Sequence, residues 1–127
     1  MAAAEKQISR QIEQALQDMM DSVPELRGTI VADNEGLPLA QILPAGLDAL
    51  RAAAISAIAQ GLGRRTVEML KSGALTEVAV AGTEGLTFLY TVGSRFVLVV
   101  LAPNDTNVGL IHLTARECAK KIAMMIG

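Results

Sequence analysis

The segment Phe96–Ala102 constrains the fold more than any other part of the chain. Its residues, Phe-Val-Leu-Val-Val-Leu-Ala, are apolar at every position. In an extended strand, successive side chains point to opposite faces, so both faces of this strand must avoid water. The run is also far shorter than the roughly 20 residues that a membrane-spanning helix needs. We therefore predict a central β-strand that is covered on both sides by other elements.

The remaining periodic segments predict three helices and four further strands. The expected elements are a helix at 5–22, strands at 27–33 and 37–43, a long helix at 47–71, strands at 76–81, 86–92 and 95–102, and a final helix from about 107. Short turns, among them Asp33–Gly36 and Gly93-Ser94, join neighbouring strands, which makes those pairs antiparallel. The chain is long enough to bury one core, and we expect a single domain, 1–127.

These elements predict an α/β (α+β) three-layer sandwich around one five-stranded, antiparallel-rich sheet. The doubly apolar fifth strand should lie in the middle beside the first, which gives the spatial order 2-1-5-4-3. The long helix then covers one face, and the N- and C-terminal helices cover the other. The strand Thr76–Ala81 becomes an edge strand whose one charged residue is Glu77, and an edge this poorly guarded invites pairing with another strand.

The long helix has two contrasting sides. At about 100° per residue, its larger apolar residues form one broad stripe, which we expect to face the core: Leu47, Ile55, Ile58, Leu62 and Met69. The opposite side begins with small, uncharged residues: Ala49, Ala52, Ala53, Ser56, Ala57 and Gln60. We interpret that side as a surface where a second helix can come close. The alternative is that alanine is present because it is the best helix former.

The small-residue side and the edge strand follow one another in the chain, so one two-fold dimer contact can use both. The predicted interface residues are Ala49, Ala53, Ser56, Ala57, Gln60, Thr76, Val78 and Val80. Arg64 and Arg65 are candidates for contacting the acidic surface of a further partner. The alternative for both arginines is a solvated helix end, because surface charges often contribute nothing specific.

The composition favours a protein partner over nucleic acid. Of the residues, 51% are hydrophobic and 19% are charged, so part of the apolar surface is expected to face a partner. The net charge is −2 and the basic residues are scattered, whereas phosphate binding needs a basic stripe. The N-terminus has no apolar run of signal-peptide length. We expect a cytoplasmic protein without membrane insertion.

The residue inventory does not predict catalysis. His112 is the one histidine and Cys118 the one cysteine. On the last helix they would lie about 120° apart, a poor nucleophile–base pair, and Cys118 falls in the apolar stripe as a core thiol. Too few ligands converge for a metal site. Gly61–Arg65 lacks the Lys-Ser/Thr ending of a phosphate loop. We predict no catalytic, cofactor or metal site.

Three stretches together resemble a known family. Gly28–Ala40 contains an Asp-x-x-Gly-Leu-Pro turn, Leu75–Gly82 follows the alanine-rich helix, and Val99–Leu110 joins the last strand to the last helix. In this order they are similar to the roadblock / dynein light chain domain family, in its small single-domain prokaryotic form. The combination covers nearly the whole chain.

The resemblance implies a dimer, with itself or a relative, built through the central helix and the third strand. It also implies a non-catalytic role, either regulating a small Ras-like GTPase, for example as a GTPase-activating partner, or scaffolding a larger assembly. We consider three hypotheses: a homodimeric platform for such a GTPase, a purely structural dimeric adaptor subunit, and an enzyme that binds a small ligand in a pocket of the sheet.

Overall fold

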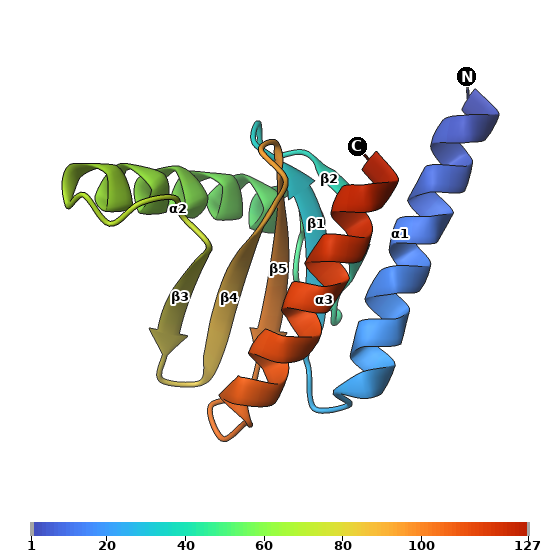
Figure 1. The fold of residues 1–127 in the computed structure, drawn as a ribbon. Helices are drawn as coiled ribbons and strands as arrows, with labels where there is room; N and C mark the ends of the chain where they lie inside the picture. The colour runs from blue at the N-terminus through green and yellow to red at the C-terminus, as the bar shows by residue number, and fades with distance from the viewer. Residues whose placement is uncertain (1, 127) are drawn as a thin grey trace.

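The computed structural model describes residues 2–126, so the predicted domain ends, Met1 and Gly127, lie outside the described residues. All the predicted helices and strands are present within this range (Figure 1). Their bounds are α1 Ala2–Ser22, β1 Gly28–Asp33, β2 Pro38–Ile42, α2 Ala49–Met69, β3 Glu77–Gly82, β4 Gly85–Val92, β5 Phe96–Ala102 and α3 Val108–Ile126.

The five strands form one antiparallel sheet in the order β2-β1-β5-β4-β3, which confirms the predicted topology. β5 lies in the centre, where Val99 pairs with Ile30 of β1 and with Leu89 of β4. The side chains of residues 97–100 are buried on both faces of the sheet. The uniformly apolar sequence of this strand therefore matches its position.

Helices cover both faces of the sheet, as the sequence predicts. α1 and α3 lie side by side on one face, and α2 crosses the other face near one end of the strands (Figure 1). The core under α1 and α3 is large and contains Leu16, Ile111 and Ile122. Cys118 is buried in this layer, which confirms the prediction of a core thiol. The core under α2 is smaller and is built around Ile30, Leu89 and Val99.

The orientation of α2 contradicts the sequence prediction. Its stripe of larger apolar residues, Leu47, Ile55, Ile58, Leu62 and Met69, faces outward, with exposed fractions from 44% for Leu47 to 79% for Met69. The small-residue side faces the sheet, where Ala53, Ser56 and Gln60 are buried. Both helix-face assignments are therefore wrong, and these three buried residues are not available to a dimer contact. Ala49, Ala52 and Ala57 are half-buried beside them.

The small side chains allow α2 to lie close to the sheet. A Cβ atom added at Gly63 would lie 2.7 Å from Cγ2 of Val78 on β3, which is too close for a normal contact. The polar groups on this side bond within the chain. Ser56 donates to the carbonyl oxygen of Ala52 at 2.7 Å, and the Gln60 amide donates to that of Phe96 at 3.5 Å. Large residues on this side would push the helix away from the strands.

Candidate protein-interaction surface

The outward side of α2 carries a stripe of large apolar residues. Ile55, Ile58, Leu62 and Met69, which we call the α2 stripe, fall within about 60° of one another around the helix axis. More than 60% of each of these residues is exposed. Single exposed apolar residues are ordinary, but a contiguous row of large ones typically marks a protein–protein contact.

One side of the α2 stripe has the spacing of a helix–helix seam. Ile55, Leu62 and Met69 recur every seven residues. Ala52 and Ala59 precede the first two of them by three positions and are also seven residues apart. Alternating spacings of three and four residues bring side chains into register along two packed helices, and the alanines leave room for a close approach. This spacing indicates that the partner of the stripe is another helix.

An apolar groove runs beside α2 over the uncovered part of the sheet. It has a volume of about 520 Å³. Its floor is formed by strand residues of the sheet and its wall by residues of the first half of α2 and the loop before it. The lining residues are Ile30, Thr87, Val99 and Leu101 from the strands, and Gly46, Leu47, Asp48, Arg51, Ala52, Ile55 and Ser56 from the wall. The α2 helix therefore covers only part of its sheet face.

β3 forms one edge of the sheet and pairs only with β4 within residues 2–126. Val80 is 51% exposed on the α2 side of this strand. Val78 is half-buried against Gly63 and Leu75, and Thr76, in the loop before β3, accepts the backbone N–H of Thr91 through its carbonyl oxygen at 3.1 Å. The position of β3 at the edge is confirmed, and it leaves one side of its backbone without a neighbouring strand.

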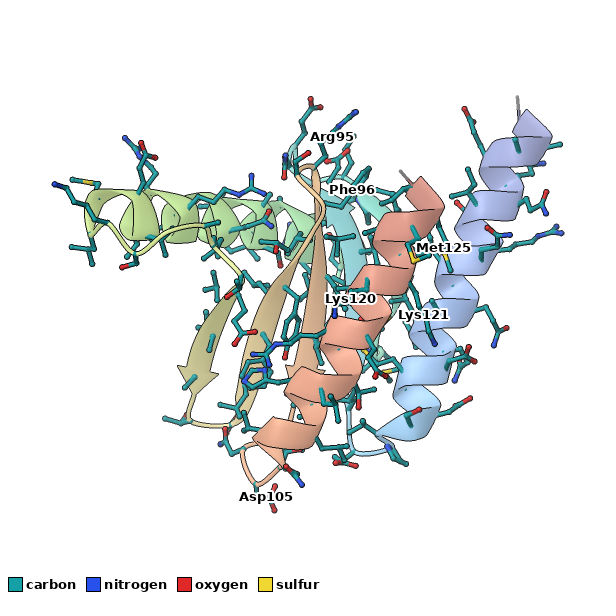
Figure 2. The ribbon with its side chains drawn as sticks, viewed as in Figure 1. Arg95, Phe96, Asp105, Lys120, Lys121 and Met125 are labelled. Atoms are coloured by element: carbon teal, nitrogen blue, oxygen red, sulfur yellow. The ribbon has the colours of Figure 1, made fainter. Side chains whose placement is uncertain are left out.

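The two adjacent arginines of α2 differ in their surroundings. Arg64 is half-buried and its Nη2 donates to the carbonyl oxygen of Ser94 in the β4–β5 turn at 3.4 Å. Arg65 is exposed on the outward side of the helix. Lys120 and Lys121 belong to α3, on the other layer (Figure 2). The two basic pairs therefore lie on opposite sides of the sheet and do not form one phosphate-binding stripe.

Sequence analysis missed a polar cluster between the sheet and α3. The hydroxyl of Tyr90 lies 2.7 Å from Nδ1 of His112, and the Arg116 guanidinium donates to both carboxylate oxygens of Glu77 at 2.8–3.2 Å. Burial is the main reason that the pKa of Tyr90 is raised, so its phenol stays protonated. Glu77 and Tyr90 face each other across β3 and β4. His112 and Arg116 are one helical turn apart, a spacing that the sequence alone displays.

The candidate catalytic groups do not form a site. Cys118 Sγ donates to the carbonyl oxygen of Ala15 at 3.6 Å, and burial raises the pKa of this thiol to about 11. His112 bonds to Tyr90 instead. Within residues 2–126, no cluster of three histidine, cysteine or acidic residues is arranged to hold a metal ion. None of the helices in this range combines the length and apolar character needed to cross a bilayer.

Comparison with known proteins identifies the class. The Roadblock/LC7 domain family matches residues 12–102, and the chain belongs to this family. The resemblance noted from the sequence is thus confirmed, and domains of this family are generally non-catalytic. Two relatives from Methanocaldococcus jannaschii, the uncharacterized proteins MJ1340 and MJ0310, are each 33% identical over 100 residues, covering 79% of this chain and 87% of the relative.

Solved structures share the fold. Myxococcus xanthus MglB superposes with a TM-score of 0.86 at 17% identity, covering 93% of this chain and 89% of MglB. A structure described as MglB with tetrameric arrangement gives 0.85 at 16% identity, with coverages of 93% and 89%. A Roadblock/LC7 domain from Streptomyces avermitilis gives 0.82 at 22% identity, covering 90% of this chain and 96% of that domain. At sequence identities this low, the similarity shows a shared fold alone.

Proposed function

We propose that this protein is a non-enzymatic homodimeric interaction module that regulates or scaffolds a small Ras-like GTPase. The observation that carries the proposal is the α2 stripe, four large apolar side chains exposed beside an unpaired sheet edge. A stripe of this kind is unfavourable in water, so it is expected to be covered by protein in the working form. The GTPase partner comes from the family resemblance, which is an argument by analogy.

A two-fold axis next to β3 would satisfy both features at once. Two copies of β3 would pair across the axis and extend the sheet, and the two α2 helices would run antiparallel on the same face. Gly63 lies over Val78 of the edge strand, and the end of α2 reaches past that edge (Figure 1). In the dimer, that end would lie over the partner copy. The groove beside the partner's α2 is the apolar surface available to receive it.

The proposed contact replaces much of the set predicted from sequence. Its helix seam is formed by Ile55, Leu62 and Met69, which are exposed on the outward side of α2, and it is bordered by the half-buried Ala52 and Ala59. Val80 stays in the proposed interface, since it is exposed on the same face of the edge strand. The interface therefore uses the large residues of α2 instead of the small ones.

Arg65 is the part of α2 that we assign to a further partner. It lies outward, near the α2 stripe, and its guanidinium makes no hydrogen bond or ion pair recorded within residues 2–126, whereas Arg64 is tied to the β4–β5 turn. An exposed guanidinium suits the acidic surface of a partner protein. In this proposal the dimer positions the GTPase and reorders its loops, and it contributes no reacting group.

The test is a pull-down from native cytosol with the purified protein, run in parallel with GDP and with a non-hydrolysable GTP analogue. The proposal predicts that a small GTPase is retained in one nucleotide state. Arg65→Glu should weaken its retention, while Glu117→Gln, a charge change on the opposite layer, should not. Recovery of the same partners in both states, with no GTPase among them, would contradict the proposal and favour the structural adaptor.

The small-ligand hypothesis has less support. The groove beside α2 is large enough for a ligand, but ligand sites usually contain several convergent polar groups. Among its lining residues, Ser56 already donates to Ala52 O, and Asp48 accepts the backbone N–H of Leu50 at 3.0 Å at the start of α2. These polar side chains serve the helix, so an apolar protein segment suits the groove better.

A further inference from the structure

The two faces of the edge strand are supported unequally. On the α2 side, Val78 lies against Gly63 and packs on the core under α2. On the α3 side, β3 presents Glu77, Ala79 and Ala81, and the two alanines are exposed. Within residues 2–126, every side-chain hydrogen bond between β3 and α3 is donated by Arg116 and accepted by Glu77. One ion pair therefore takes the place of apolar packing on this face.

The geometry of this ion pair is restrictive. Both Nε and Nη2 of Arg116 donate to the Glu77 carboxylate, and a two-pronged contact fixes orientation as well as distance. The hydrogen bond between Tyr90 and His112 holds the next strand to α3 one helical turn earlier. Because Glu77 and Tyr90 are directly opposite in the β3–β4 pair, the two contacts together set how the edge of the sheet sits under α3.

We propose that Glu77 and Arg116 are positioning residues for self-association: they hold β3 in the geometry in which its free edge pairs with a second copy. This inference rests on the proposed dimer and adds the element that prepares its edge. Arg116 is about half exposed, and exposed ion pairs contribute little to stability. Their loss should therefore affect the alignment of the edge strand more than the fold of one copy.

In this proposal α3 influences the dimer interface although it does not contact the partner copy. α3 lies on the opposite side of the sheet from the α2 stripe (Figure 1). Anything that pulls Arg116 away from Glu77, such as an acidic side chain of a protein bound on α3, would loosen β3. Assembly through β3 would then weaken although no interface residue had changed.

The experiment compares the full chain with Glu77→Gln, Arg116→Gln and the double exchange Glu77→Arg/Arg116→Glu. Sedimentation equilibrium measures the dimer dissociation constant, and urea unfolding at low concentration measures the stability of one copy. We expect each single variant to raise the dimer dissociation constant about fivefold, because both copies lose the contact. The double variant with swapped charges should recover part of the lost dimer affinity. Glu117→Gln, an exposed acid next to Arg116 in sequence, is the matched control and should change nothing.

Two results would overturn the proposal: single variants that dimerise like the unmodified protein, or single variants whose weaker dimerisation is fully explained by lower stability of one copy. Hydrogen exchange separates this inference from the proposed dimer. If the unmodified protein is monomeric, the dimer proposal fails, and hydrogen exchange in β3 then tests only whether the ion pair fixes the edge strand. Faster hydrogen exchange of residues 77–82 in both single variants, reversed in the charge-swapped double variant, supports that fixing role, and unchanged hydrogen exchange refutes it.

Discussion

The two helical layers of this protein follow opposite rules. In the α1/α3 layer, large apolar residues such as Leu16 and Ile122 point to the sheet and are fully buried. In the α2 layer, Ala53 and Gly63 face the sheet, while Ile58 and Leu62 point to solvent. The first layer completes a core within one chain. The second resembles half of a core, which indicates that α2 is packed against its own sheet and is also available to another molecule.

The largest expected difference between the layers concerns stability. Leu16→Ala in α1 should lower the free energy of unfolding by about 2–5 kcal/mol, because it leaves a cavity in a fully buried site. Ile58→Ala on the α2 stripe should change the stability of one copy by less than about 0.5 kcal/mol, since its side chain is exposed there. Urea unfolding at low protein concentration measures both. Equal losses would mean that the stripe is part of the monomer core.

Two glycines of α2 sharpen the comparison within one helix. Gly61→Ala should stabilise the protein by about 0.5–1 kcal/mol, because alanine favours helix and no atom lies within 4 Å of the added Cβ. Gly63→Ala gains the same helix propensity but forces the new Cβ against Val78. We expect it to be less stable than Gly61→Ala by about 1 kcal/mol or more. Thermal unfolding at low concentration distinguishes the two, and equal gains would refute the close packing of α2 on β3.

A further difference, which is expected only at high pH, concerns the thiol in the α1/α3 layer. Burial raises the pKa of Cys118 to about 11, against 9.0 for an unperturbed thiol. The unfolded chain therefore loses this proton first as the pH rises, and the thiol's contribution to stability is lost between about pH 9 and 11. Stability should fall over that range less steeply in Cys118→Ala than in the unmodified protein. At pH 8, a thiol reagent should modify the native protein much more slowly than the urea-unfolded chain.

Most of the architecture was predictable because it depends on sequence patterns that are each compatible with a single arrangement. A strand that is apolar on both faces, such as Phe96–Ala102, has to be central, and the short turns then determine which strands are neighbours. The burial of Cys118 was predictable for the same reason, since it falls in a stripe of apolar residues with Ile111, Ala115 and Ile122. In both cases the pattern itself separates the inside from the outside.

The orientation of α2 was not predictable in this way. Periodicity separates the two sides of a helix, but it assigns the inward side only when the outward one is charged. On α2, the small-residue side starts without charge and the side of the larger apolar residues starts with a single charge, Arg51, so the usual rule that larger apolar residues are buried selected the wrong side. The contact between Gly63 and Val78 was the missing information, because it depends on residues from two elements. The Glu77–Arg116 pair was missed for the same reason.

The most direct test of this account is the mass of the protein in solution when charge is placed on either layer. Ile55→Asp lies on the α2 stripe, and Leu113→Asp lies on α3 with the same exposed fraction of 61%. Light scattering across a concentration series should find a dimer for the unmodified protein and for Leu113→Asp, and a folded monomer for Ile55→Asp. A dimer that survives Ile55→Asp, or that is lost equally in both variants, would contradict the assignment of the α2 stripe as the contact between two copies.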